Sequence, residues 1–435
     1  MKRAPDPDWI AARRLAAART LRAATSATHL ERHRSGFGWT VRPAAGSILA
    51  STRIASWDPE PDYFHHWVRD AAIALRAVPL AIAAEPEARG FWLEAVADTV
   101  RFSLRISDPS RRGPATNPLR ATTRQSHEQF LRPDGELAGL AGEKWLEEPR
   151  FAADGCPDLE QWGRPQDDGP ALRASAVMAL VDALPEVASP DTDALVARAL
   201  EHSLRVAGRP CIGPWEEAPA RRSTFTLIAE WDALDRGCAR AAARGASAPA
   251  MRAAADRIVT LMQEARDARS GGWRESVEAP EGHFDSATVL AILHAGRRDG
   301  PFAISAPATR ATVAALEACF AALYPINRGQ GAPAIGRWKE DVYFGGNPWY
   351  PTTLGFAELH YRLAAMGEAE AFEKAEAWMG LVQSVAPDPA EPLAEQFDRR
   401  TGAPVSCLAL TWSAAAFLEA AAARDTALQA MAGAR

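Results

Sequence analysis

The segment PDYFHHWVRD, residues 61–70, combines side chains that suit recognition of a neutral polar ligand. Tyr63 and Trp67 offer flat apolar faces, while Arg69 and Asp70 offer a rigid set of hydrogen-bond donors and an acceptor. Taken alone, the last two residues fit a structural function equally well, with the aspartate capping the following helix and the arginine paired to it.

A second cluster, QWGRPQDDGPALRA, covers residues 161–174. Pro170 suits the first turn of a helix, with Asp168 or Gly169 as its cap. This structural explanation leaves out Trp162, because a tryptophan in a polar, glycine-containing loop has no helical stripe to join. The local pattern therefore leaves Trp162 without a structural explanation.

Two further clusters supply carboxylates. In GPWEEAPARRSTFT, residues 213–226, Glu216 and Glu217 follow Trp215, and an acid beside an apolar ring can have a raised pKa. Two exposed charges at a helix start are the alternative. In PLAEQFDRRTGAPVSCLALTWS, residues 392–413, Glu395 lies in a loop that leads into a late helix, and by itself it is uninformative.

Other chemistries find no support in the sequence. HExxH, GxSxG, a Walker loop and a GxGxxG after a strand are all absent. His65 and His66 are adjacent and would point in different directions, and no third ligand is evident. The sequence therefore predicts neither a metal site nor a cofactor.

The elements that must position these clusters are helices. Apolar residues recur at 3.6-residue spacing, as in Val313, Leu316 and Phe320, and such stripes face a core. Twelve helical runs are predicted, near residues 8–30, 68–84, 88–106, 169–184, 191–207, 222–241, 248–268, 284–297, 307–323, 350–366, 368–385 and 407–424.

Long segments rich in proline and glycine separate these helices and hold nearly every unusual cluster, which is typical of functional loops on a helical frame. No linker composition and no repeat of 30–50 residues is visible. The simplest interpretation is one all-α domain over residues 1–435, in which 1–45 form an N-terminal helix and lead-in. Two concentric rings of six helices would satisfy it, although counting helices cannot establish closure.

Composition excludes several classes of protein. The net charge of -6 and the pI near 5.9 argue against a nucleic-acid binder. No stretch approaches the roughly 20 apolar residues of a membrane span, and no signal peptide is visible. We therefore expect a cytoplasmic protein; a secreted protein whose leader has been removed is the alternative. The five cysteines are odd in number and widely spaced, so the sequence does not indicate a disulfide framework.

Taken together and in order, the clusters resemble the glucoamylase family (glycoside hydrolase family 15). The resemblance runs from about Gly46 to Glu419. It includes EPRF followed by WGRPQDDGPALRA, then GPWEE, then GRWKEDVYFGGNPWYPTTL at 336–354, and AEQFDRRTG.

The resemblance implies an (α/α)6 barrel with the active site in a funnel at one end. It implies that Glu216 is the general acid and Glu395 the general base of an inverting exo-acting α-glucosidase, which releases β-glucose from α-1,4-linked malto-oligosaccharides. The implied substrate-binding residues are Tyr63, Trp67, Arg69, Asp70, Trp162, Trp215, Glu217, Arg337, Trp338, Asp341 and Trp349.

The departures from the family pattern keep alternatives open. Trp338-Lys339 replaces the usual Tyr-Pro, and Ala218-Pro219-Ala220-Arg221 replaces the usual Val-Asn-Gly. Linkage preference is therefore open, with α-1,6 bonds or trehalose as alternative substrates. A non-catalytic carbohydrate-binding regulator is a third hypothesis, which retention of both glutamates opposes. No starch-binding module is recognised, so short oligosaccharides are expected.

Overall fold

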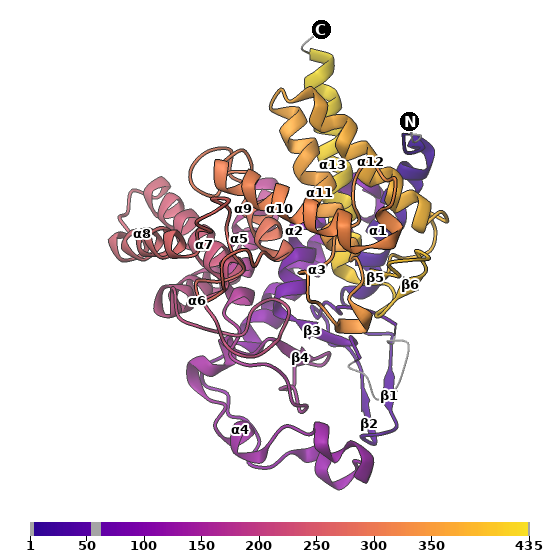
Figure 1. Ribbon diagram of the computed structural model, residues 1–435. Helices are drawn as coiled ribbons and strands as arrows, with labels where there is room; N and C mark the ends of the chain where they lie inside the picture. Colours follow the sequence, from indigo (N-terminus) through magenta and orange to yellow (C-terminus); the bar gives the residue numbers. More distant parts are fainter. Residues whose placement is uncertain (1–3, 54–61, 434–435) are drawn as a thin grey trace.

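The computed structural model describes residues 4–53 and 62–433, so Pro61 of the first cluster lies outside the described part (Figure 1). All twelve predicted helices are present, and α4, inside the long 108–167 segment, is one that the sequence did not predict. The helices are α1 (Pro7–Ala24), α2 (Val68–Ala84), α3 (Arg89–Ile106), α4 (Asp134–Ala138), α5 (Asp168–Ala183), α6 (Pro190–Val206), α7 (Thr224–Ala243), α8 (Pro249–Glu264), α9 (Ser286–Ala295), α10 (Pro307–Leu323), α11 (Tyr350–Ala365), α12 (Ala369–Val385) and α13 (Thr411–Gly433).

Alternate helices close into an inner ring. Helix α2 packs on α5, α5 on α7, α7 on α9, α9 on α11, α11 on α13, and α13 returns to α2. The remaining long helices, α1, α3, α6, α8, α10 and α12, pack outside this ring. The described chain is thus an (α/α)6 barrel, as predicted.

The burial of the helices explains this division. All ten residues of α9 are buried, because an inner helix is covered on every side. In α8 only Ala254, Ala255, Ile258 and Met262 are buried, and they form one stripe along a helix whose other residues are half-buried or exposed. A single buried stripe at 3.6-residue spacing is therefore typical of an outer helix such as α8, whereas an inner helix such as α9 is apolar all round. Both patterns predict a helix.

The start of α5 differs from the prediction. Asp167 is the N-cap residue and makes no side-chain capping bond, so neither Asp168 nor Gly169 caps the helix. Instead Asp168 accepts a hydrogen bond of 3.1 Å from Arg69 in the first turn of α2. A partner 99 residues away in the sequence determines where this carboxylate points.

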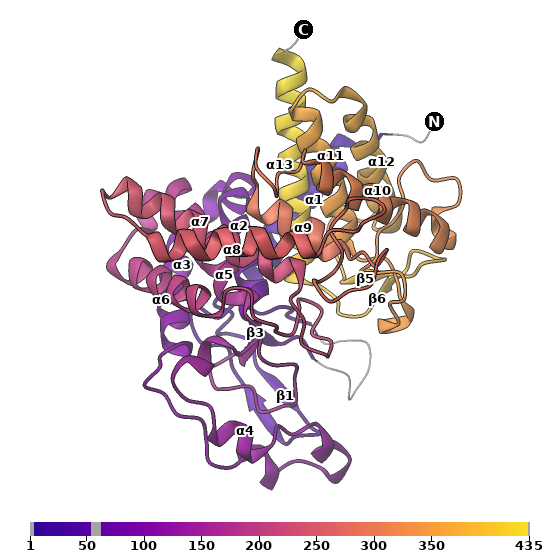
Figure 2. The ribbon, with the colours of Figure 1, turned by 60° about the vertical axis from the view of Figure 1, so that its left-hand side comes forward.

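Within residues 4–53 and 62–433, three small antiparallel pairs lie among the loops. They are β1 (Arg32–Arg34) with β2 (Trp39–Val41), β3 (His65–Trp67) with β4 (Arg150–Ala152), and β5 (Gln396–Phe397) with β6 (Pro404–Val405). Figures 1 and 2 show β1, β2 and the segment around α4 at the end of the molecule opposite the two termini. In the β3–β4 pair, Trp67 is directly opposite Arg150.

No described helix has the length and apolar character needed to cross a membrane. All five cysteines are free, and Cys211 and Cys407 are buried.

Candidate active site

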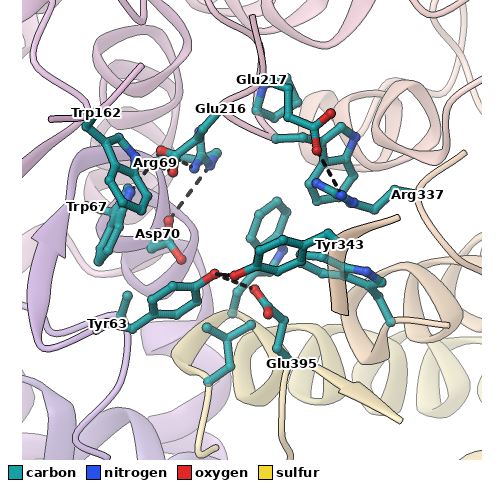
Figure 3. A pocket seen from close by; sticks show the side chains of 16 residues that line it. Tyr63, Trp67, Arg69, Asp70, Trp162, Glu216, Glu217, Arg337, Tyr343 and Glu395 are labelled. Carbon is teal, nitrogen blue, oxygen red and sulfur yellow. Dashed lines mark hydrogen bonds and ion pairs between the residues drawn. The ribbon is translucent and has the colours of Figure 1, made fainter. Parts of the chain in front are cut away.

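The predicted clusters meet in one pocket (Figure 3). Its lining comes from the segments that lead into the inner helices and from the first turns of α2 and α13. The lining residues are Ala50, Tyr63, Trp67, Arg69, Asp70, Trp162, Pro214, Trp215, Glu216, Glu217, Arg337, Tyr343, Trp349, Glu395, Leu410 and Trp412.

Glu216 lies in the loop between α6 and α7 and has a left-handed backbone, with φ of 65°. Its carboxylate accepts hydrogen bonds from the indole nitrogens of Trp67, at 2.9 Å, and of Trp162. Arg69 Nη2 at 3.2 Å and Gln166 Nε2 at 3.1 Å complete the set of donors. Four N–H donors therefore hold this side chain in one orientation.

This environment corrects the expectation that Trp215 provides an apolar wall against the Glu216 carboxyl. Instead, the Trp215 ring stacks on Trp412, with centroids 6.0 Å apart and planes 16° from parallel. Its Nε1 donates to both carboxylate oxygens of the buried Asp285, at 2.9 and 2.8 Å. The side chains of the consecutive residues Trp215 and Glu216 therefore point in different directions.

Glu395 is buried just before β5, on the opposite side of the pocket from Glu216 (Figure 3). It accepts a hydrogen bond from the Ser406 hydroxyl, and another of 3.1 Å from the Tyr63 hydroxyl. Burial raises the pKa of Glu395 to about 7, while the two hydroxyl donors and Arg337 act in the opposite direction. Ser406 reaches the carboxyl from a left-handed backbone, with φ of 65°.

Arg69 and Asp70 are buried in the first turn of α2, and Asp168 is buried in the first turn of α5. Arg69 donates at 3.1 Å to Asp168 and at 3.1 Å to Gln166, in addition to its contact with Glu216. Burial raises the pKa of Asp70 to about 6, although neighbouring Arg69 lowers it.

Arg337 forms the other charged wall. It pairs with Glu217 at 2.9 Å and with Asp341 through Nε at 2.9 Å. Its guanidinium lies over the rings of Trp338, 4.2 Å from the centroid, and of Trp349, 5.2 Å away. Trp338 and Asp341, two of the predicted substrate-binding residues, do not line the pocket; both contact Arg337.

The pocket also contains residues that sequence reasoning missed. Tyr343 bonds to Tyr63 at 2.9 Å between hydroxyl oxygens, and Trp412 forms the floor under Trp215. Both belong to segments singled out in the sequence, GRWKEDVYFGG and LALTWS, so their aromatic character was the available signal. Trp349 was predicted, and its buried Nε1 has no hydrogen-bond partner among the described residues.

The adjacent histidines point apart, as β-strand alternation requires. His66 accepts from the Ile48 backbone at 3.0 Å, whereas His65 lies beside Asp158 and Glu160, with potential ligand atoms within 4.8 Å of one another. Sequence reasoning found no third ligand there. The two carboxylates are already neutralised by arginines, including Arg150 at 2.9 Å from Asp158, so the group is an ion-pair cluster.

Comparison with known proteins agrees with this geometry. The sequence matches the model of "Glycosyl hydrolases family 15" over residues 37–422. It is similar to Glucoamylase-1 of Arthroderma benhamiae, with 28% identity over 440 residues, which cover 89% of this chain and 66% of the relative. It is also similar to the intracellular sporulation-specific glucoamylase of Saccharomyces cerevisiae, with 26% identity over 352 residues, covering 73% of this chain and 58% of the relative.

The chain spans about half to two thirds of the length of the first curated relatives, at 66%, 52% and 64%. Among solved structures, the glucoamylase of Hormoconis resinae superposes with a TM-score of 0.74 at 24% identity, covering 96% of this chain and 73% of the other. The family 15 glucoamylase of Hypocrea jecorina gives 0.74 at 23% identity, covering 96% and 72%. This likeness establishes the fold.

The family match extends from just before β2 to the middle of α13, and so includes the other five inner helices, the first half of α13 and every residue of the pocket. The chain belongs to glycosyl hydrolase family 15.

Proposed function

We propose that this protein hydrolyses α-glucosidic bonds and releases glucose from non-reducing ends with inversion of configuration. The observation that carries the proposal is the pair Glu216 and Glu395, which face each other across one pocket lined by aromatic rings, Arg69 and Asp70. Glycosidases of this kind use two carboxyl groups on opposite sides of the scissile bond.

In the proposed reaction Glu216 gives a proton to the glycosidic oxygen as the bond from that oxygen to the anomeric carbon breaks. Glu395 accepts a proton from a water molecule, whose oxygen forms the new bond to the anomeric carbon from the other face. Exchange with solvent then returns the proton from Glu395 to Glu216. Since attack occurs opposite the leaving group, an α-linked substrate yields β-glucose.

The remaining pocket residues suit a single terminal glucose. We propose that Arg69, Asp70 and Arg337 bind its hydroxyl groups. The unpartnered Trp349 Nε1 offers one further donor at the pocket wall. The rings of Tyr63 and Trp162 would contact the apolar faces of the sugar.

We propose α-1,4-linked malto-oligosaccharides as the substrate class, because the curated relatives are named glucoamylases. A specific observation supports the α-1,6 and trehalose alternatives. Trp338 and the segment Ala218–Arg221 differ from the family pattern, and both line a second hollow that shares Glu216 and Glu217 with the pocket.

Hydrolysis of maltose, isomaltose, trehalose, panose and soluble starch, scored by glucose release, tests the linkage. Proton NMR of the fresh product, read before mutarotation, tests the stereochemistry, and β-glucose is expected. Glu216→Gln and Glu395→Gln should each lower kcat by about 10²–10⁴-fold, because each removes one proton-transfer step. Initial release of α-glucose, or near-normal rates in either variant, would contradict the proposal.

We further propose that the described residues act as one catalytic domain inside the cell. The closed ring of inner helices supports the first point. Five free cysteines, of which Cys156 is exposed, suit a reducing compartment and support the second. Cell fractionation with an antibody to the native protein tests the location, and recovery from the medium would contradict it.

A further inference from the structure

The two tryptophans that donate to Glu216 share a cation behind them. Arg150, in β4, is completely buried, and its guanidinium carbon lies 3.6 Å from the ring centroid of Trp162 and 4.9 Å from that of Trp67. The two indoles meet edge to face, with centroids 5.8 Å apart and planes at 72°. Each ring has its N–H on Glu216, so one arginine contacts both donors of one carboxylate.

The backbone fixes one of these contacts. Trp67 and Arg150 are directly paired across β3 and β4, so the pairing register holds the arginine against this ring. Trp162 has no such support, because residues 161–166 form neither helix nor strand. Side-chain contacts therefore orient this ring, namely those with Arg150, Trp67 and Glu216, and a stacked guanidinium suits that purpose.

Arg150 is itself held in place. Its Nε donates to Asp158 at 2.9 Å and its Nη2 donates to the same carboxylate at 3.3 Å, a bidentate arrangement that fixes the plane of the guanidinium. Glu160 adds an ion pair at 3.6 Å. A guanidinium fixed in this way limits the orientations open to the two rings that it contacts.

We propose that Arg150 is a positioning residue for the reaction: by holding Trp67 and Trp162 so that both indole N–H groups meet Glu216, it sets the orientation in which this glutamate reaches the glycosidic oxygen. The inference rests on the proposed function. Among the described residues Arg150 does not line the pocket and makes no hydrogen bond to Glu216. Its charge also acts on Glu216, and its contacts reach that glutamate through the two rings.

Two substrates separate this effect from simple damage to the pocket. Maltose needs a proton on its leaving oxygen, whereas α-glucosyl fluoride loses fluoride as an anion and needs no proton from the enzyme. Both place the same glucose in the pocket. A variant in which the Glu216 carboxyl is wrongly oriented should therefore lose activity on maltose and keep most of its activity on the fluoride. Glu216→Gln, which has no acid at all, should show the largest difference between the two substrates.

The main variant is Arg150→Gln, which removes the cation. It should fold, because Asp158 keeps Arg164 at 2.7 Å and Glu160 keeps Arg34. We expect the ratio of kcat/KM for maltose to that for the fluoride to fall about tenfold, a part of the 10²–10⁴-fold that an acid typically contributes. Arg150→Lys keeps the charge but has no planar group to stack, and its ratio should lie between those of Arg150→Gln and the wild type.

The matched control is Arg111→Met. Arg111 lies over the Trp145 ring at 4.1 Å, away from the pocket, so its loss removes the same kind of contact and should leave the ratio unchanged. Equal losses on both substrates in Arg150→Gln, or an unchanged ratio, would overturn the inference while leaving the proposed function intact. If that variant fails to fold, the ratio in Arg150→Lys decides, and a wild-type ratio there overturns it. A wild-type protein inactive on both substrates would instead refute the proposed function, and the inference with it.

Discussion

Glu216 and Glu395 reach the pocket from distant parts of the chain and are held by different kinds of partner. The first accepts from indole, guanidinium and amide nitrogens, and the second from the hydroxyls of Ser406 and Tyr63. Residue types alone left Glu395 uninformative, and it was the resemblance of the ordered clusters to the glucoamylase family that selected both glutamates. Their partners were not predictable, because Tyr63 and Glu395 are 332 positions apart.

The Ser406 hydroxyl should control the pH at which the proposed base works. Its hydrogen bond stabilises the ionised form of Glu395, whose pKa burial holds at about 7. Ser406→Ala removes that bond and should raise the pKa further. The acid limb of kcat/KM against pH, where activity grows as the base loses its proton, should then move to higher pH. An acid limb at the wild-type position would show that the hydroxyl does not control this ionisation.

Asp285 offers a residue-scale test of stability. Burial raises its pKa to about 7, well above the value of an unfolded aspartate near 4, so the folded state favours the protonated form. The stability that this contributes is fully present below pH 4 and is lost as the pH rises through 7. Asp285→Asn stays neutral and can still accept from Trp215. Its melting temperature relative to wild type should therefore rise by several degrees between pH 5 and pH 9; a constant difference would contradict the raised pKa.

At the scale of elements, the local sequence pattern predicts which segments are helices, whereas long-range packing determines the details of their ends. The twelve long helices were predictable because each has a periodic apolar stripe or an alanine-rich apolar run. The cap of α5 was misassigned because Asp168 bonds to Arg69 in another helix. The three strand pairs are two or three residues long, too short for alternation to reveal them.

The contact between the starts of α2 and α5 leads to a prediction for Gly169. A Cβ added there would lie 2.9 Å from Val68 Cβ and 3.4 Å from the Arg69 backbone nitrogen, so Gly169→Ala must push the two helices apart. We expect a loss of about 1–3 kcal/mol in unfolding free energy and a lower kcat, since Arg69 moves with α2.

The matched control for this change is Gly90→Ala in the outer helix α3, where an added Cβ meets nothing within 4 Å. This variant should keep full activity, and its stability should be unchanged or raised by up to about 1 kcal/mol. Urea denaturation and maltose hydrolysis of both variants provide the comparison. Equal behaviour of the two alanines would mean that the close approach of α2 and α5 does not matter.

For the whole molecule, closure of the ring is the property that the sequence could not supply. Helix counting allowed two concentric rings, but closure depends on α13 meeting α2, at the far ends of the chain. The same closure brings Trp412 under Trp215, so the pocket floor exists only when the last inner helix is in place. Fold and site are therefore expected to form together.

Truncation tests that dependence. Ending the chain after Ala409 removes α13, which packs against α11, α2 and α1, and leaves the apolar sides of its neighbours in water. We expect no cooperative thermal transition and no hydrolysis from this shortened chain, because one of the six inner helices is missing.

The control ends the chain after Leu428 and removes only the end of α13, whose residues are mostly exposed. Such residues contribute little to stability, so the melting temperature should stay within about 2 °C of wild type. Calorimetry of both truncations, with maltose hydrolysis alongside, distinguishes a ring that must close from a set of helices that fold independently; a cooperative transition in the chain ending at Ala409 would support the second.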